Sequence, residues 1–299
     1  MPFQQNNPIN MATVRSYDIF VPPTPRSAQL PAIFIFHGAG QEIQTIEQRW
    51  GINPPNPVPP LLAEYMLIFA ETDPTLSDKW VHYKKNDSRF PEHDLLFVDD
   101  LVNEITSMAY NSGDPDIPTV SADPALLYTA GFSSGAGMVW QIANSDRVGL
   151  FQGFGTVGLA LDPEKANHYR NQLGGAPPPI PLIYIMGTAD SNFRSPATLR
   201  EVPITSTFPF HSVEEMLKRN GPLPPGAAQT SLIAGSTGVT EVVAQLWTGG
   251  AKAFSYITVI NGGHNWPTPT TVGNPPVATH YNATEAIVQF WINFAGLPG

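Results

Sequence analysis

The sequence predicts an α/β fold with a mostly parallel central sheet and helices on both of its faces. Short apolar runs alternate with helical stretches along the 299 residues, which is the pattern of parallel strands joined by crossover helices. Four runs end in glycine-containing turns that carry a histidine, a serine or an aspartate, and parallel strands present such turns at one edge of a sheet. Because the motifs extend from residue 37 to residue 264 and must meet in space, we expect one domain spanning residues 1–299.

The individual elements follow from apolar runs and from helix signals. Strands are expected where short apolar runs occur, at residues 13–21, 32–36, 65–70, 125–130, 181–186, 242–247 and 254–260. Helices are expected at residues 94–108, 136–143, 211–220 and 284–294. The first helix places four apolar residues on one face, namely Leu95, Val98, Leu101 and Val102. The third is expected to begin with a capping box, in which Ser212 is the N-cap and Glu215 follows three residues later.

The turn between the strand at 125–130 and the helix at 136–143 reads Gly131-Phe132-Ser133-Ser134-Gly135. A strand, a G-x-S-x-G turn and a helix in that order are typical of a nucleophile elbow, which exposes one strained serine at the strand tip. Ser133 is the candidate nucleophile because it has glycine at both −2 and +2, and the N–H of Ser134 is a candidate oxyanion donor. A glycine-rich turn without chemistry is the alternative.

A serine hydroxyl needs a base, and the base needs an orienting acid, in the chain order serine, acid, histidine. Asp190 follows the apolar run at 181–186, and His264 lies in a glycine-flanked loop after the run at 254–260. Both positions fall at the strand ends where α/β sheets place their sites. Asp190 could instead cap a turn, His264 could be an ordinary loop histidine, and Asp162 is the main rival acid.

The strand at 32–36 runs into His37-Gly38-Ala39-Gly40-Gln41, whose small residues let the backbone approach a substrate carbonyl. The corresponding loop of hydrolases carries an HG-type motif that completes the oxyanion hole. We therefore expect the Ala39 N–H to act with the Ser134 N–H, with Gly40 as the next choice. His37 is expected to be structural, because it lies too early in the chain to be the base.

Composition excludes several classes of function. The formal net charge is −10 and no basic cluster occurs beyond Lys84-Lys85, which argues against a nucleic-acid partner. No apolar run approaches the length of a membrane span, no cysteine is present, and the motifs imply no metal and no cofactor. Because 32 residues are proline and only 13% are charged, we expect an extracellular protein whose secretion signal is absent from this sequence. The oligomeric state is left open.

With these residues identified, nearly the whole chain resembles the poly(3-hydroxybutyrate) depolymerase and feruloyl esterase-like branch of the α/β-hydrolases. The most specific stretch is Gly262-Gly263-His264-Asn265-Trp266-Pro267, since that family places Trp-Pro just after its base. The resemblance implies an α/β-hydrolase fold, a single catalytic domain and a serine esterase without a cofactor. It makes Ser133 the nucleophile, His264 the base and Asp190 the partner of the base.

The resemblance also suggests an aromatic substrate wall made by Trp266, with Trp80 opposite and Gly40 nearby; packing in the core is the alternative for both indoles. The favoured substrate is an ester, and in particular an aliphatic or aromatic polyester. A feruloyl or acetyl-xylan type of carbohydrate ester, an amide hydrolase of the prolyl peptidase type and a hydrolase-like binding protein without turnover are the alternatives. The absence of cysteine and the unusual segment 73–89 depart from the family pattern.

Overall fold

The computed structural model describes residues 15–52, 58–73, 79–80, 93–110, 119–161, 175–191, 208–221, 228–233, 241–268 and 280–299. Nine strands from these residues form one sheet in the order β1-β3-β2-β4-β5-β6-β9-β8-β7. The six strands from β3 to β9 in this order run parallel, while β1, β8 and β7 are antiparallel additions at the two sides. The strands are β1 (Tyr17–Phe20), β2 (Gln29–Phe36), β3 (Met66–Ala70), β4 (Ser121–Phe132), β5 (Gly153–Val157), β6 (Leu182–Gly187), β7 (Gln229–Ile233), β8 (Val242–Trp247) and β9 (Phe254–Val259).

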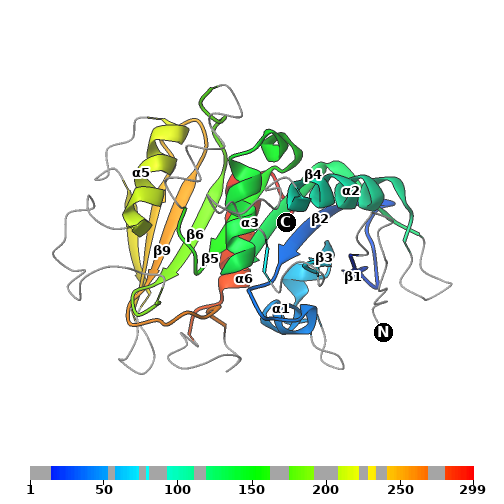
Figure 1. Cartoon of the computed structure of the whole chain (residues 1–299), viewed down its shortest axis with the longest axis horizontal. Helices are drawn as coiled ribbons and strands as arrows, with labels where there is room; N and C mark the ends of the chain where they lie inside the picture. The colour runs from blue at the N-terminus through cyan, green and yellow to red at the C-terminus, as the bar shows by residue number, and fades with distance from the viewer. Residues whose placement is uncertain are drawn as a thin grey trace.

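Helices cover both faces of the sheet, as the sequence predicts (Figure 1). One apolar cluster packs α2 (His93–Ser107), α3 (Ser134–Ala143) and α5 (Phe208–Asn220) against one face. The other cluster packs α1 (Ile43–Arg49) and α6 (Ala283–Phe294) against the opposite face. Two short 3₁₀ helices, η1 (Pro60–Leu62) and η2 (Asp146–Leu150), lie between these elements. None of the helices in the described ranges combines the length and the apolarity needed to cross a bilayer.

The parallel register brings the carboxyl ends of four central strands to one edge. Phe36 at the end of β2 pairs with Gly131 of β4, and the last residue of β4, Phe132, pairs with Val157 of β5. Gly187 at the end of β6 pairs with Val259 of β9 in the same way. The turns that follow β2, β4, β6 and β9 therefore emerge side by side.

Most expected elements are confirmed with shifts of a few residues at their ends, but two strands, one α-helix and the two 3₁₀ helices were not predicted. Strand β5 contains Gly153 and Gly155, which weaken a strand pattern. A Cβ on Gly153 would lie 2.6 Å from the Trp291 ring of α6, so glycine is needed there for close packing. Strand β7 is exposed and lacks an apolar face, and helix α1 is only seven residues long.

The predicted capping box at Ser212 is wrong. Helix α5 begins at Phe208, so Ser212 lies inside the helix. Its Oγ accepts a hydrogen bond from the backbone N–H of Leu161 at 2.8 Å and ties α5 to the segment after β5. Ser212, which the sequence pattern predicts as a helix cap, therefore makes a tertiary contact instead.

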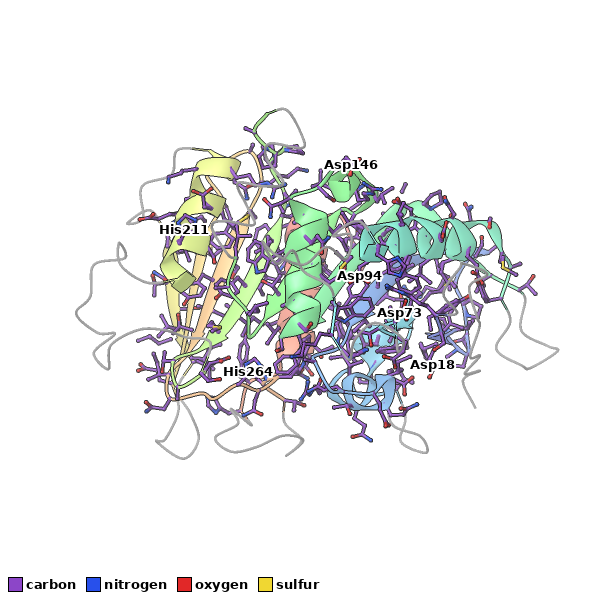
Figure 2. All side chains as sticks on the ribbon, viewed as in Figure 1. Asp18, Asp73, Asp94, Asp146, His211 and His264 are labelled. Atoms are coloured by element: carbon purple, nitrogen blue, oxygen red, sulfur yellow. The ribbon has the colours of Figure 1, made fainter. Side chains whose placement is uncertain are left out.

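A buried ionic cluster lies where the segment before β1 meets the start of α2. The Arg15 guanidinium, 1% exposed, lies 2.5 Å from Asp94 and 3.9 Å from Asp73, and His93 contacts the same Asp73 carboxylate at 3.2 Å. Figure 2 shows Asp73 and Asp94 close together beside α2, apart from His264. Because the cluster fixes Asp73, it also holds the segment just after β3, which carries Glu71.

Candidate active site

Ser133 stands at a strained turn between β4 and α3. Its φ of 51° and ψ of −115° lie in a region that non-glycine residues rarely adopt. The turn is held by hydrogen bonds from the Ser133 N–H to Val157 O and from Gly137 N–H to Ser133 O, at 2.8 and 3.0 Å. A Cβ on Gly131 would lie 2.3 Å from the backbone of Gly135, which leaves no room for any other residue type. The turn therefore has the geometry expected of a nucleophile elbow.

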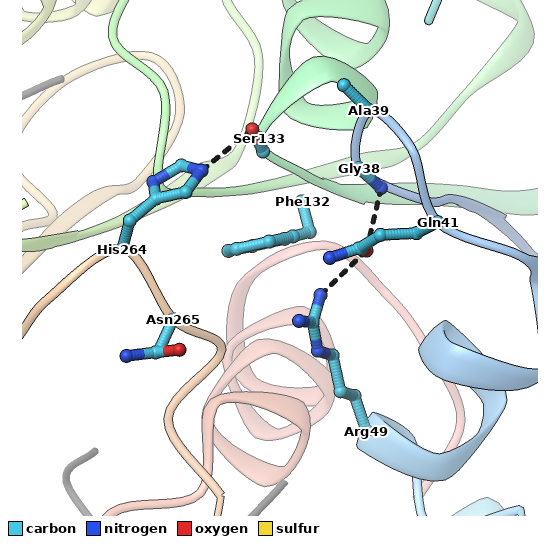
Figure 3. A pocket seen from close by; sticks show the side chains of 8 residues that line it. All are labelled: Gly38, Ala39, Gln41, Arg49, Phe132, Ser133, His264 and Asn265. Carbon is cyan, nitrogen blue, oxygen red and sulfur yellow. Dashed lines mark hydrogen bonds between the residues drawn. The ribbon is translucent and has the colours of Figure 1, made fainter. Parts of the chain in front are cut away.

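The structure brings Ser133, His264 and Asp190 together in one chain of hydrogen bonds. His264 Nε2 lies 2.8 Å from Ser133 Oγ, and His264 Nδ1 lies 2.7 Å from Asp190 Oδ2. The Asp190 side chain is 1% exposed, while the His264 side chain is 31% exposed. The carboxylate is therefore buried and fixes the imidazole, whose other nitrogen faces the half-buried Ser133 (Figure 3).

Backbone contacts lock the loop of the acid to the loop of the base. The N–H of Ala189 donates to Gly262 O at 2.8 Å, and the N–H of Asn261 donates to Thr188 Oγ1 at the same distance. A Cβ on Gly187 would lie 2.3 Å from Gly262 O, so the two loops touch at their backbones. This close approach explains the glycine at position 187, and it holds the loop of Asp190 against the loop of His264.

The turn after β2 forms the opposite side of the site. Gln41 N–H donates to Gly38 O at 3.3 Å, and Gly40 takes the positive φ of 64° that such a tight turn requires. The Gln41 side chain returns to accept the Gly38 N–H at 3.1 Å (Figure 3). The Gly38 amide is engaged in this way, and Ala39, the next residue along the turn, lines the cavity together with Ser133.

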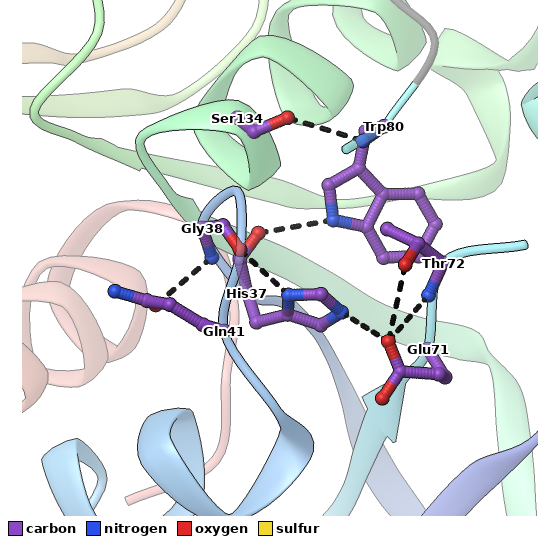
Figure 4. Close-up of polar contacts among 7 residues, drawn as sticks. All are labelled: His37, Gly38, Gln41, Glu71, Thr72, Trp80 and Ser134. Atoms are coloured by element: carbon purple, nitrogen blue, oxygen red, sulfur yellow. Dashed lines mark hydrogen bonds and ion pairs between the residues drawn. The ribbon is translucent and has the colours of Figure 1, made fainter. Parts of the chain in front are cut away.

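Three further side chains support this turn (Figure 4). His37 is fully buried; its Nδ1 lies 2.8 Å from Gly38 O and its Nε2 lies 2.7 Å from Glu71 Oε1. Both partner atoms are oxygen acceptors. Trp80 donates from its indole N–H to His37 O at 3.0 Å and from its backbone N–H to Ser134 Oγ at 3.1 Å. His37 therefore has the structural place that its early position in the chain predicts.

The Glu71 carboxyl is adapted to this ion pair. Burial alone would raise its pKa, but hydrogen bonding and charge attraction from His37 act against burial, together with two hydrogen bonds from Thr72. The net effect is a pKa below the ordinary value for a glutamate. Glu71 is therefore ionised at neutral pH, when it pairs with His37.

A cavity of about 280 Å³ opens above Ser133. Beside Ser133, His264 and the turn at 38–41, it is lined by Phe132, Arg49 and Asn265. The Phe132 ring lies 5.0 Å from the His264 ring and 4.2 Å from the Arg49 guanidinium, centre to centre, so it is in contact with both. Burial lowers the pKa of Arg49 to about 10, which leaves the guanidinium charged at neutral pH.

Three residues of this cavity were not predicted from the sequence, namely Arg49, Gln41 and Phe132. Phe132 and Gln41 stand inside motifs that were recognised, so their closeness to Ser133 was readable in the sequence. The place of Arg49 at the cavity could not be predicted, because Arg49 is the last residue of α1, a helix that was not expected. A basic residue in the last turn of a helix is ordinary and gives no indication of a cavity.

The two candidate substrate-wall tryptophans lie in the core instead of the cavity lining. Trp266 is fully buried between Trp50 and Phe132, and its indole N–H donates to Thr284 Oγ1 at 3.2 Å. Trp80 is 1% exposed and packs against Phe36 and Phe97. Both indoles have buried partners for their N–H, so packing accounts for them.

Gly40 and Asp162 are the two other candidate residues. Gly40 is exposed and is absent from the lining. Asp162, the rival acid, lies outside the described residues. Within the part of the chain that the structure describes, no three acidic or imidazole side chains are grouped as metal ligands would be.

No protein-family model matches the sequence, and no curated protein matches it significantly. Solved structures do match over nearly their full length. They include an S-formylglutathione hydrolase from Agrobacterium tumefaciens, with a TM-score of 0.55 at 11% identity, covering 99% of this chain and 94% of that one. An esterase from Thermogutta terrifontis with bound propionate matches with a TM-score of 0.54 at 13% identity, covering 98% of this chain and 94% of that one.

An acetyl xylan esterase from Aspergillus awamori gives a TM-score of 0.52 at 14% identity, covering 97% of this chain and 98% of that one. At such low identities the likeness concerns the fold. The chain has the α/β-hydrolase fold, as the order of its strands and the turn at Ser133 predict.

Proposed function

We propose that the protein is a serine hydrolase of carboxylic esters that works through an acyl-enzyme. The observation that carries the proposal is the continuous chain Ser133–His264–Asp190, with both links at 2.8 Å or less and the serine hydroxyl at an open cavity. A buried carboxylate, an oriented imidazole and a strained serine are the parts that nucleophilic acyl transfer requires.

In the proposed reaction, Ser133 Oγ attacks the ester carbonyl while His264 Nε2 removes its proton. Asp190 holds the imidazole in the tautomer that accepts at Nε2 and stabilises the imidazolium that forms. The N–H groups of Ala39 and Ser134 donate to the oxyanion of the tetrahedral intermediate. His264 then protonates the leaving alcohol, and water repeats the sequence on the acyl group bound to Ser133.

For the substrate, we propose a short acyl unit of a polyester. A cavity of about 280 Å³ has room for a short acyl group at Ser133. The polyester itself rests on the family resemblance of the motif after β9. An acetylated or feruloylated carbohydrate is the second candidate, because one structural neighbour that covers nearly the whole chain is an acetyl xylan esterase. We further propose that the protein acts outside the cell as a single catalytic domain.

The test combines covalent labelling with turnover. The wild-type protein should form a stoichiometric adduct with a fluorophosphonate at Ser133 and should hydrolyse nitrophenyl acetate and butyrate. Ser133→Ala should lose the adduct and lower kcat by about 10⁴-fold or more. Ser107→Ala, which changes an exposed serine on α2, is the matched control and should retain both.

If the wild-type protein forms no adduct and cleaves no ester, it is a hydrolase-like binding protein, and the proposal fails. If it cleaves amides of the same acyl group as fast as esters, it is an amidase. Product release from aliphatic polyester, aromatic polyester, acetylated xylan and feruloyl esters then separates the candidate substrates.

A further inference from the structure

The guanidinium of Arg49 is a buried cation that faces the cavity without a matching anion. Arg49 is 6% exposed and contributes to the cavity lining. A guanidinium has five N–H donors. Nη1 donates to Gln41 Oε1 at 2.9 Å, whereas Nε has no acceptor among the described residues. Most of the hydrogen-bonding capacity of this group is therefore unused.

No carboxylate among the described residues forms an ion pair with Arg49; the arginine ion pairs in this part of the chain involve Arg15, Arg26 and Arg147. Burial is the cause of the lowered pKa of Arg49, and no neighbouring charge contributes to it. Arg147, in contrast, is paired with Asp99 and Asp146, which together raise its pKa. The amide oxygen of Gln41 and the face of Phe132 compensate Arg49 only in part, because both are neutral.

The place of this cation relative to the reacting groups is set by Phe132. The ring of Phe132 contacts the His264 imidazole and the Arg49 guanidinium, and Figure 3 shows the ring between them. A ligand bound at Ser133 therefore has the guanidinium within reach on the far side of the ring, in the same cavity. Planar bidentate binding of a carboxylate is the interaction for which a guanidinium with free donors is best suited.

We propose that Arg49 binds a carboxylate of the substrate, so that the preferred ester carries a second, ionised carboxyl group. This inference rests on the proposed esterase function and specifies the substrate class of the same site. Such esters are half-esters of dicarboxylic acids and oligomers of a polyester that end in a free carboxylate. The carboxylate would supply the negative charge that the Arg49 guanidinium has no partner for in the free protein, and it would orient the ester carbonyl toward Ser133.

Arg49 also has a structural contact, and the experiment has to separate the two roles. By donating to Gln41 Oε1, it fixes the side chain that accepts the Gly38 N–H, and so it supports the oxyanion turn. Loss of this support slows every ester to the same extent. Loss of carboxylate binding slows only the anionic esters, and it raises KM for them.

The experiment compares matched ester pairs that differ in one carboxylate. On the acyl side, the nitrophenyl half-ester of glutaric acid is compared with nitrophenyl pentanoate; on the alcohol side, acetoxypentanoate is compared with pentyl acetate. At constant ionic strength, kcat/KM of the wild-type protein should be roughly 10- to 100-fold higher for the anionic member of at least one pair, as expected for a charged hydrogen bond. Arg49→Met should remove this preference, mainly through KM, and Arg49→Lys should restore part of it.

Gln41→Met is the control for the structural contact, because it removes the support of the turn and keeps the cation. It should slow both members of a pair equally. A measurement on the wild-type protein covers the case in which an Arg49 variant does not fold: free glutarate should compete with fluorophosphonate labelling of Ser133, and glutaramide should not.

Equal kcat/KM values within both wild-type pairs, or equal losses for both members in Arg49→Met, would overturn this inference while leaving the esterase proposal intact. Glutarate and glutaramide protecting Ser133 equally would do the same. Failure of the esterase proposal is recognised separately, by the absence of labelling and of turnover on the neutral esters.

Discussion

Replacement of Gly135 by alanine tests whether the elbow and the oxyanion turn are built against each other. Gly135 lies in the first turn of α3, two residues after Ser133. A Cβ there would lie 2.0 Å from Phe36 O, 2.5 Å from Phe36 C and 2.7 Å from His37 O. All three atoms belong to the backbone at the end of β2, which cannot move away as the end of a flexible side chain can.

Two effects of opposite sign set the size of the change. Alanine in place of glycine stabilises a helix by about 1 kcal/mol. The contact with Phe36 O, however, is roughly 1.5 Å shorter than a van der Waals contact, and overpacking of this kind costs about 1–3 kcal/mol or more. Because only backbone atoms are available to shift, we expect the clash to win and the free energy of unfolding to fall by about 2 kcal/mol. For a chain of this size the melting temperature should fall by about 3 °C.

Activity should fall by more than stability does, because the displaced segment leads directly into the oxyanion turn. A shift of about 1 Å in a positioning group costs on the order of 100-fold in rate. The assay is kcat/KM on nitrophenyl butyrate at a temperature well below the transition, together with thermal unfolding. The matched control is Gly149→Ala, since a Cβ on Gly149 meets no atom within 4 Å. If Gly135→Ala melts and turns over like Gly149→Ala, the close approach of α3 to β2 is not what holds the site.

Two further predictions concern the support of the oxyanion turn. The pKa of Glu71 is lower in the folded protein than in the unfolded chain, so its contribution to stability is fully present above the unfolded pKa of about 4.3. That contribution is lost as the pH falls through the lower folded pKa. The difference in free energy of unfolding between wild type and Glu71→Gln should therefore be constant from about pH 6 to 8 and shrink below about pH 4. A difference that persists unchanged at pH 3 in urea titrations contradicts this assignment. Trp80→Phe keeps an aromatic ring in the core but removes the indole N–H that donates to His37 O. This change should lower the free energy of unfolding by about 1–3 kcal/mol and leave KM for neutral esters unchanged. A raised KM with unchanged stability would instead restore Trp80 as a substrate contact.

The residues of the candidate site were predictable because each follows a strand along the chain. Ser133, Asp190 and His264 stand just after apolar runs, and strands of a parallel sheet end at a common edge. The glycines on either side of Ser133 added a local constraint that few other structures need. These are short-range patterns, so one sequence was sufficient to place three residues that are far apart in the chain.

The residues around the site were not predictable to the same degree, because their roles depend on packing. Trp80 and Trp266 are large aromatic residues near the motifs, and sequence alone leaves a substrate wall and core packing open. Ser212 matches a capping pattern but serves Leu161. Strand β5 was missed because its glycines are selected by contact with α6, a helix more than a hundred residues later in the chain.

The sequence by itself determined most of the strands and helices, the strained turn at Ser133 and the identity of the three hydrogen-bonded residues. The tertiary structure decided which side chains enclose the cavity: it buried both tryptophans, placed Glu71 against His37 and brought Arg49 to the face of Phe132. The physical reason is the range of the interactions. Turn geometry and strand pattern are encoded within a few neighbouring residues, whereas burial and charge compensation depend on which distant segments the folded sheet brings into contact.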